Sequence, residues 1–188
     1  MNNPLVTIVI LNWNGRELLQ ECLNSVLKTE YKPTEIIVVD NGSTDDSVEF
    51  VRNDYKTVII LENGKNLGYG EGNNRGIAIA NGKYVVTLNN DIIVEEDWLN
   101  KPITYLENDE KIGVIGCRQM NYFNRSVVDG YFHYPAPELT LARLGHGEIY
   151  KEDQLRRRPF LWLVSPPGAG RLWHASGVYH GQYSQYRR

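Results

Sequence analysis

The sequence predicts an α/β protein built from three layers, with helices on both faces of a mostly parallel central sheet. Strand-like and helix-like segments alternate along residues 5–117 and are joined by short links, the order expected of a sheet covered on both faces. The strand-like runs are continuously apolar rather than alternating, as in strands that are buried on both sides. A length of 188 residues is enough for one domain with a sizeable core.

The first strand is predicted at Leu5–Leu11, a β-branched apolar run that Asn12-Trp13-Asn14-Gly15 interrupts. Asn14 and Glu17 form a capping-box-like pair, so we expect a helix to begin there. Apolar residues at helical spacing from Leu18 to Leu27 then form one continuous stripe.

The second strand, Glu35–Asp40, turns at Asn41-Gly42, and Ser43 or Thr44 is expected to cap a helix that continues to about residue 52. The same alternation predicts the remaining elements. They are strands at 57–61, 83–88 and 111–117, helices from about 72 to 80 and from 95 onward, one or two short strands within 120–134, and a loop or short helix within 135–147.

Composition excludes several classes of protein. Apolar residues make up 41% and charged residues 23% of the chain, so it is globular rather than disordered. A net charge of −3 argues against a nucleic-acid partner, because a general polyanion binder needs a basic field. No apolar run approaches the roughly 20 residues of a spanning helix, so we expect no transmembrane segment; peripheral contact with a membrane stays open.

The two cysteines, Cys22 and Cys117, are too few and too far apart for a disulfide framework or a zinc site. We therefore predict that both are buried free thiols, which fits the reducing cytoplasm. We therefore expect the chain to be cytoplasmic. A position at the inner face of the membrane stays open, because that face borders the cytoplasm.

The composition changes at about residue 155, where Arg, Pro and Tyr become frequent, and no Asp or Glu follows Asp153. We therefore expect a domain at 1–154 and an atypical tail at 155–188. Our hypothesis is that the chain is truncated, with a shifted reading frame after about residue 155. The alternative is a genuine tail that binds a partner or an anionic surface through Arg156–Arg158.

Polar residues follow three of the predicted strands. They are Asn12, Trp13 and Asn14 after the first strand, Asp40, Asn41, Gly42 and Ser43 at the end of the second, and Asn89, Asn90 and Asp91 after the fourth. Because ligands of parallel sheets bind beyond the carboxyl ends of the strands, we expect these residues to converge on one binding site.

Asp40 is a candidate reader of a nucleotide base. A carboxylate accepts the N3–H of uracil or thymine, which cytosine lacks, and such a contact discriminates between bases by about 1–3 kcal/mol. This interpretation predicts a uridine or thymidine nucleotide. The alternative is that Asp40 caps the next helix or supports a turn.

Asp91 is a candidate metal ligand. A hard divalent cation that offsets the charge of a diphosphate needs oxygen ligands, while the amides of Asn89 and Asn90 can bind sugar hydroxyls without adding charge. The alternative is an Asx turn after the strand.

The loop between Asn63 and Gly76 is rich in glycine and asparagine, so backbone can approach a ligand closely and the following helix can present N–H groups to an anion. It lacks both a clean G-x-G-x-x-G after the first strand and the Lys-Ser/Thr of a P-loop. A dinucleotide enzyme and a P-loop ATPase are thus disfavoured, and a plain flexible loop remains the alternative. Trp13 is expected either to stack on a base or sugar or to pack in the core.

Taken together, these segments resemble glycosyltransferase family 2. The matching stretches are Val6–Gly15, Glu35–Asp45, Asn66–Ile77 and Leu88–Ile92, and their order and spacing agree with the family across about 5–117. The Asn89-Asn90-Asp91 form looks like the branch that contains rhamnosyltransferases.

The resemblance implies a GT-A fold, a nucleotide-diphosphate sugar donor, and Mg²⁺ or Mn²⁺. By matching position, Asn12 and Asn14 would line the nucleoside pocket, Asp40 would contact the pyrimidine, and Asp91 would bind the metal. The same resemblance places the loop and helix residues Asn66, Gly68, Asn73 and Asn74 at the nucleotide. It also implies inverting transfer, in which a carboxylate takes a proton from the acceptor.

The sequence departs from this family in two respects. Asn89 replaces the first acid of the family's Asp-x-Asp motif, and the acidic stretch of the family's second half is not found. The catalytic base is therefore unknown. The leading prediction is transfer of a sugar from a UDP- or dTDP-sugar to a carbohydrate or lipid-linked acceptor. A non-catalytic nucleotide-sugar-binding fragment is the alternative, and a pyrophosphorylase is disfavoured because Asn12–Arg16 is not the glycine-rich basic loop it needs.

Overall fold

The computed structural model describes residues 3–110, 112, 115, 117, 119–130, 132–135 and 141–144. The chain divides into two compact units. Among the described residues, the first unit ends at Glu96 and the second begins at Asp97. Every residue of the candidate site belongs to the first unit.

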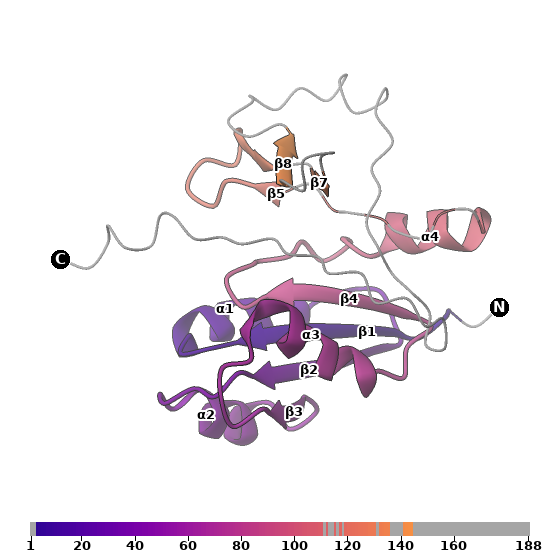
Figure 1. The fold of residues 1–188 in the computed structure, drawn as a ribbon. Coiled ribbons are helices and arrows are strands. Elements are labelled where there is room, and N and C mark those ends of the chain that lie inside the picture. The colour runs from indigo at the N-terminus through magenta and orange to yellow at the C-terminus, as the bar shows by residue number, and fades with distance from the viewer. Residues whose placement is uncertain are drawn as a thin grey trace. The chain divides into compact units, whose positions relative to one another are not determined.

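The first unit contains a parallel sheet of four strands in the order β3-β2-β1-β4 (Figure 1). The strands are β1 (Val6–Asn12), β2 (Thr34–Asp40), β3 (Ile59–Glu62) and β4 (Tyr84–Asn89). Residues 6–10 of β1 are fully buried, because this strand has a neighbour on each side and helices above and below. That position explains its continuous apolar sequence.

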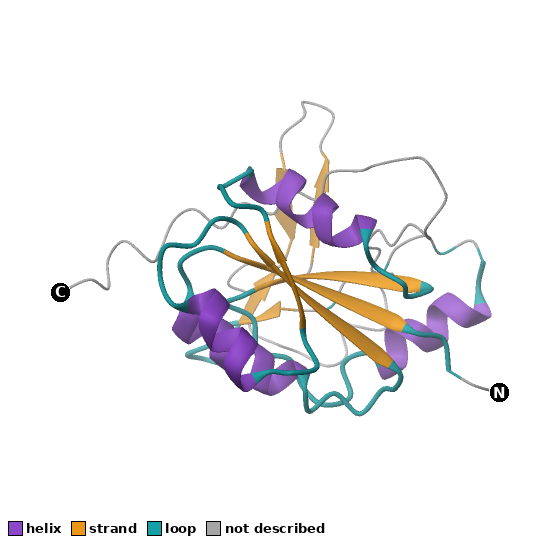
Figure 2. Cartoon of the chain, turned by 90° about the horizontal axis from the view of Figure 1, so that it is seen from below, coloured by secondary structure: helices purple, strands orange, loops and turns teal. Residues whose placement is uncertain are grey.

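Helices cover both faces of this sheet. They are α1 (Arg16–Val26), α2 (Ser47–Asp54) and α3 (Gly68–Ala78). Figures 1 and 2 show α3 on one face and α1 and α2 on the other. This follows from right-handed crossovers, since the chain steps outward from β1 to β3 and then returns past β1 to β4. The predicted three-layer α/β fold is confirmed.

Helix α3 lies unusually close to the sheet. A Cβ atom on Gly76 would be 2.5 Å from Val9 Cγ1 and 2.6 Å from Val39 Cγ2, so only glycine fits there. The sequence Gly68–Ala78 is a poor helix former by propensity. Its helix is therefore stabilised by this close packing rather than by local preference.

The second unit contains α4 (Asn100–Asn108) and two antiparallel strand pairs. In one pair β5 (Gln119–Met120) lies beside β6 (Val128–Gly130), and in the other β7 (Phe132–Pro135) lies beside β8 (Leu141–Leu144). Short strands within 120–134 were expected. The strand at β8 was not, because a four-residue run carries too little periodicity to separate it from a loop.

The starts of all four described helices differ from the prediction, and α4 begins at Asn100 rather than at about residue 95. Asn14 does not form a capping box: its φ is 50° and its Oδ1 accepts a hydrogen bond from Thr44 N, so Gly15 precedes α1 instead. Helix α2 begins at Ser47, because Ser43 Oγ bonds to the first loop rather than capping a helix. Helix α3 begins at Gly68, four residues earlier than its glycine content suggested.

Cys22 is fully buried, as predicted, whereas the prediction that Cys117 is buried is wrong, since this residue is exposed. The strand expected at 111–117 falls mostly outside the described residues, as do the boundary at 154 and the tail 155–188. In the described part of the chain, no helix is both long enough and apolar enough to cross a bilayer.

Candidate functional site

The carboxyl ends of β2, β1 and β4 lie at the same level of the sheet. In the strand register, Asn12 is opposite Asp40, and Leu11 is opposite Asn89. The connection after β1 leads to one face and β4 is reached from the other, so this edge is the topological switch point at which open α/β sheets bind ligands. The predicted convergence of the three polar strand ends is therefore observed.

Asn12 joins the three strand ends through its side chain and is completely buried. Its Nδ2 lies 3.4 Å from Asp40 Oδ1 and 3.3 Å from Ser43 Oγ, and its Oδ1 accepts a 2.8 Å hydrogen bond from Asn90 Nδ2. A Cβ at Gly15 would be 2.2 Å from Asn90 Nδ2. Glycine at this position thus leaves room for the link.

Asp40 is 3% exposed and supports the turn that follows β2. Its Oδ2 accepts hydrogen bonds from Gly42 N at 3.1 Å and Ser43 N at 2.9 Å, while Oδ1 accepts from Asn12. Gly42 has a φ of +77°, and a Cβ there would meet the backbone of Lys65 at 2.6 Å. The turn-supporting role is real, yet a carboxylate offers about four acceptor positions, so Oδ1 can still accept one more bond.

Asn41 uses every hydrogen-bonding position of its amide within the protein. Its Nδ2 donates to Asn66 Oδ1 and Gly68 O, and its Oδ1 accepts from Asn63 Nδ2 and Leu67 N. The residue is 2% exposed. Its side chain therefore holds the loop that precedes α3 and has no position left for a ligand. In the same loop, Asn66 is exposed and accepts a bond from Gly68 N at 2.8 Å.

Asn73 carries a buried acceptor that the described residues leave unsatisfied. The side chain is 5% exposed, and its Nδ2 donates to Tyr69 O at 2.9 Å within α3. Its Oδ1 is buried and receives no hydrogen bond from the described residues. A buried acceptor in this state calls for a donor such as a hydroxyl or an N–H group. Asn74, the next residue of α3, is half-buried.

Asp91 is half-buried, and its charge acts on groups from both helical layers. Burial raises the pKa of the Cys22 thiol on α1 to about 12, and the Asp91 carboxylate contributes to this rise. Burial also raises the pKa of Tyr69 on α3, again with a contribution from Asp91 and against a hydrogen bond with Thr87. Asp91 thus lies near both helices at the end of the sheet. Sequence reasoning missed Tyr69, whose signal was one aromatic residue within the glycine-rich loop.

A divalent cation would have to share its ligands with a substrate. Among the described residues, no group of three or more His, Cys, Asp or Glu could hold a metal ion. Asp91 offers one carboxylate beside the amides of Asn89 and Asn90. Mg²⁺ is often held by one or two carboxylates together with substrate phosphates and water. The donor set therefore fits a cation shared with a diphosphate and does not fit one held by the protein alone.

The aromatic residue at the end of β1 faces solvent. Trp13 is 55% exposed, so the alternative in which it packs in the core is wrong. Its neighbour Asn14 is also exposed, while Asn89 and Asn90 are half-buried. Trp13 is therefore available to a ligand.

A cavity of about 440 Å³ lies on one side of this site. Asp40, Gly42 and Ser43 line one part of it. The rest of its wall comes from the remainder of the loop before α2, which includes Asp45, from α2 itself and from the end of β3 with the residues that follow it. Its size is within the range of small-molecule pockets. However, no residue from the end of β4 lines it, so it does not include the expected position of a cation.

Comparisons with known proteins point to one family. GlyG of Streptococcus pneumoniae is 32% identical over 153 residues, which cover 78% of this chain and 49% of GlyG. The poly-β-1,6-N-acetyl-D-glucosamine synthase of Staphylococcus aureus is 30% identical over 115 residues, covering 58% of this chain and 27% of that enzyme. The chain thus spans about half or less of the length of these relatives.

Solved structures share the fold. S. aureus TarS 1-349 in complex with UDP superposes with a TM-score of 0.60 at 20% identity, covering 68% of this chain and 39% of that chain. Mannosyltransferase PcManGT from Pyrobaculum calidifontis, in complex with GDP-Man and Mn²⁺, gives a TM-score of 0.59 at 25% identity, covering 63% and 36%. The likeness to these glycosyltransferases identifies the fold as GT-A.

The family model described as Glycosyl transferase family 2 matches residues 7–158, which is most of the chain. This range contains all four strands of the parallel sheet except the first residue of β1, and every residue of the candidate site. The chain belongs to glycosyl transferase family 2.

Proposed function

We propose that the site binds a UDP- or dTDP-sugar and that the sugar is transferred, with inversion, to a carbohydrate or lipid-linked acceptor. The observation that carries this proposal is the buried Asn12 amide, which ties Asp40 to Asn90, the residue before Asp91. In this proposal the base reader and the cation ligand lie on one connected rim.

In this proposal the nucleoside lies against the ends of β1 and β2. The remaining acceptor position of Asp40 Oδ1 takes the imide N3–H of the base, and Trp13 stacks on the base or the sugar. Asn14 N donates a 2.9 Å hydrogen bond to Ser43 Oγ, and these two residues form the wall of the nucleoside site between Trp13 and Asp40. The orphaned Asn73 Oδ1 supplies an acceptor for a donor group of the nucleotide.

The diphosphate lies toward β4 in this proposal. Asp91, with Asn89 and Asn90 beside it, would hold Mg²⁺ or Mn²⁺ together with the phosphate oxygens. Such a cation stabilises the negative charge of the departing diphosphate. The solved structure of PcManGT contains Mn²⁺ with its sugar nucleotide, which supports a shared cation in this fold.

The sugar and the acceptor are the least constrained parts of the proposal. The Asn89-Asn90-Asp91 sequence supports a place for this chain in the rhamnosyltransferase-like branch of the family. The similarity to a poly-β-1,6-N-acetyl-D-glucosamine synthase supports polysaccharide biosynthesis, hence a carbohydrate or lipid-linked acceptor. We propose that this takes place in the cytoplasm, at the inner face of the membrane.

A second candidate function is nucleotide-sugar binding without turnover. It is favoured by one observation: no Asp or Glu follows Asp153 in the sequence, and no residue has been assigned as the base that takes the acceptor's proton. Incubation of the purified chain with a UDP-sugar, with release of UDP as the readout, separates the two candidates. A chain that binds UDP and releases none from the donor is the binding form.

Calorimetry with UDP, dTDP, GDP and CDP, each with and without Mn²⁺, tests the proposed donor. We expect UDP and dTDP to bind in the presence of Mn²⁺ and CDP to bind about tenfold more weakly or worse, because cytosine has no N3–H to donate. Mn²⁺ alone should not bind measurably, since the described residues at the end of β4 offer it one carboxylate, that of Asp91. Equal affinity for all four nucleotides would contradict the base-reading role.

Two variants separate the contribution of Asp91 to cation binding from the contribution of Asp40 to base preference. Asp91→Asn should remove the dependence on Mn²⁺ while leaving the affinity for uridine unchanged. Asp40→Asn should reduce the preference for UDP over CDP, because its amide can donate as well as accept. Glu17→Gln, an exposed acid in the first turn of α1, is the control for the loss of one negative charge. Binding by Asp91→Asn that still requires Mn²⁺ would exclude Asp91 as the ligand.

A further inference from the structure

Helices α1 and α2 begin side by side, and neither is capped by its own preceding residue. Gly15 before α1 has no side chain to accept a bond, and Asp46 before α2 makes no side-chain cap. The first N–H groups of a helix need acceptors from elsewhere when they are not solvated. Both helices obtain one from the same residue.

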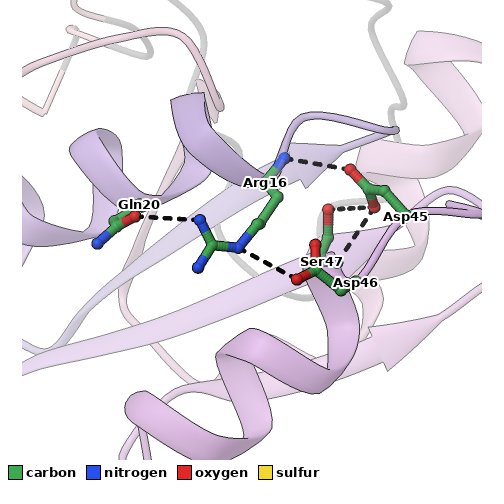
Figure 3. A network of polar contacts seen from close by, with 5 residues as sticks. All are labelled: Arg16, Gln20, Asp45, Asp46 and Ser47. Carbon is green, nitrogen blue, oxygen red and sulfur yellow. Dashed lines mark hydrogen bonds and ion pairs between the residues drawn. The ribbon is translucent and has the colours of Figure 1, made fainter.

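That residue is Asp45, in the loop between β2 and α2 (Figure 3). Its Oδ2 accepts a 3.2 Å hydrogen bond from Arg16 N, the first residue of α1. Its Oδ1 accepts a 3.1 Å bond from Ser47 N, the first residue of α2, and a second bond from Ser47 Oγ. One carboxylate thus lies at the positive ends of two helix dipoles, where a negative charge is stabilising.

The side chain of Arg16 adds a second connection between the same helices. Its Nε lies 3.4 Å from Asp46 Oδ2, and its guanidinium carbon lies 4.4 Å from the centre of the Phe50 ring on α2. Its Nη1 donates to Gln20 within α1. We call Arg16, Asp45, Asp46 and Ser47 the Asp45 clasp.

The clasp lies beside the proposed nucleoside site, since Asp45 and Asp46 line the same cavity as Asp40 and Ser43. The loops that it joins also carry Asn14 and Ser43, which meet through the bond from Asn14 N to Ser43 Oγ at 2.9 Å. Thr44 N donates to Asn14 Oδ1 at 2.7 Å, and Asn12 Nδ2 reaches Ser43 Oγ at 3.3 Å. The spacing of these loops therefore depends on the helix starts that Asp45 holds together.

We propose that Asp45 is a positioning residue that sets the width of the nucleoside site by capping α1 and α2 at once. This inference rests on the proposed function, because it assigns the space between the two loops to a nucleoside. It also has an electrostatic consequence. Since Asp45 occupies the positive ends of α1 and α2, the anionic diphosphate is directed away from them, toward the cation proposed at Asp91.

The test compares Asp45→Ala and Asp45→Asn with the wild-type chain, using uridine and UDP with Mn²⁺ as probes. We expect Asp45→Ala to bind both probes about tenfold more weakly, because charge-assisted hydrogen bonds are lost at both helices. An equal loss for uridine and UDP marks a nucleoside effect, in contrast to the UDP-specific loss expected for Asp91→Asn. Asp45→Asn should lie between, since its single oxygen can serve only one helix well.

Amide hydrogen exchange reports directly on the shared capping. The amides of Arg16 and Ser47 should exchange faster in Asp45→Ala than in the wild type, and those of β1 should not. Val26→Ala is the stability control: it removes buried methyl groups at the far end of α1, so it should lower the melting temperature and leave both affinities unchanged. Glu17→Gln controls for charge in the same helix.

The outcomes separate this inference from the proposed function. If the wild type binds uridine and UDP and Asp45→Ala binds them equally well, Asp45 is only a structural cap and the positioning role is overturned. If Val26→Ala weakens binding as much as Asp45→Ala does, the effect is one of stability and the role is again overturned. If the wild type binds neither probe, the proposed function itself fails and takes the positioning role with it.

Discussion

Short amide side chains hold the site together at the level of single residues. Asn12 and Asn41 are buried, and each donates as well as accepts, so each can bridge neighbours on both sides without bringing a charge into the interior. A carboxylate of the same shape could only accept. The choice of asparagine is therefore set by the chemistry of its neighbours.

Asn41→Asp tests this requirement. The change removes the two N–H donors that reach Asn66 Oδ1 and Gly68 O, and it places a charge at a position that is 2% exposed. We expect the free energy of unfolding to fall by about 2–3 kcal/mol or more, measured by urea denaturation at neutral pH. Asn66→Asp is the matched control, because Asn66 is exposed and its Oδ1 only accepts bonds. Equal losses in the two variants would contradict the explanation.

The sequence predicted which residues lie at the candidate site better than it predicted the residues that hold the loops together. Asp40 and Asp91 were predictable as members of one site, because polar residues at the ends of parallel strands must meet at one edge. The roles of Asn41, Asp45 and Tyr69 were not. Asn41 and Asp45 join loops that lie more than twenty residues apart in sequence, and Tyr69 on α3 bonds to Thr87 on β4. Such contacts leave no periodic signal.

At the scale of elements, the buried strands were predicted to within one or two residues, since continuous β-branched runs have few alternative structures. The starts of α2 and α3 were predicted less closely. Ser43 has the right chemistry for a helix cap but bonds to Asn14 instead, and the glycines of α3 suggested a loop because propensity ignores tertiary packing. Close packing of α3 against β1 and β2 decides its structure.

Gly76→Ala measures that packing. Alanine favours a helix over glycine by up to about 1 kcal/mol, but its Cβ would lie 2.5 Å from Val9 Cγ1 and 2.6 Å from Val39 Cγ2. We expect overpacking to prevail and to cost about 1–3 kcal/mol net in urea denaturation. The double variant Gly76→Ala/Val9→Ala should lose less than the sum of the single changes. A Gly76→Ala variant more stable than wild type would show that α3 has room to move.

The opposite end of the sheet is fastened by Glu35. Its carboxylate accepts hydrogen bonds from Thr7 Oγ1 at 2.6 Å, from Asn81 N at 3.0 Å and from Asn81 Nδ2 at 2.7 Å. Partial burial raises the pKa of Glu35, but these bonds outweigh burial and lower it below its ordinary value of 4.5. The carboxylate thus stabilises the fold when it is ionised.

This gives a pH dependence with a definite sign. Because the folded pKa is lowered, the stability contributed by Glu35 is present above the unfolded value and is lost as the pH falls through the folded pKa. We expect wild type to exceed Glu35→Gln in unfolding free energy at neutral pH, with a gap that narrows below about pH 4.5. Urea denaturation across the acid range measures it. A gap that stays constant to low pH would rule out the ionised carboxylate as its source.

For the molecule as a whole, the family match covers the part of the chain that contains the candidate site. All candidate residues belong to the unit that ends at Glu96, while the chain spans only part of the length of its relatives. Binding of the donor and transfer of the sugar are therefore separable questions.

Deletion of residues 155–188 tests the proposed domain 1–154. We expect the melting temperature and the affinity for UDP to be unchanged, because the sheet, its three helices and the whole candidate site precede the deletion. Differential scanning fluorimetry and calorimetry provide the two readouts. A large fall in melting temperature would show that these residues are integral to the fold.

The alignment of Asn12 with Asp40 and of Leu11 with Asn89 has a consequence for how such a protein can diverge. In β1, β2 and β4 a residue of the candidate site stands at the end of the strand. One residue gained or lost inside such a strand would turn that end residue to the opposite face of the sheet. Insertions and deletions can therefore be tolerated only in the connections that precede the strands. Related sequences should therefore vary in the length of the connections that run from a helix to the next strand. The number of residues between the middle of β1, β2 or β4 and the polar residue at its end should stay constant.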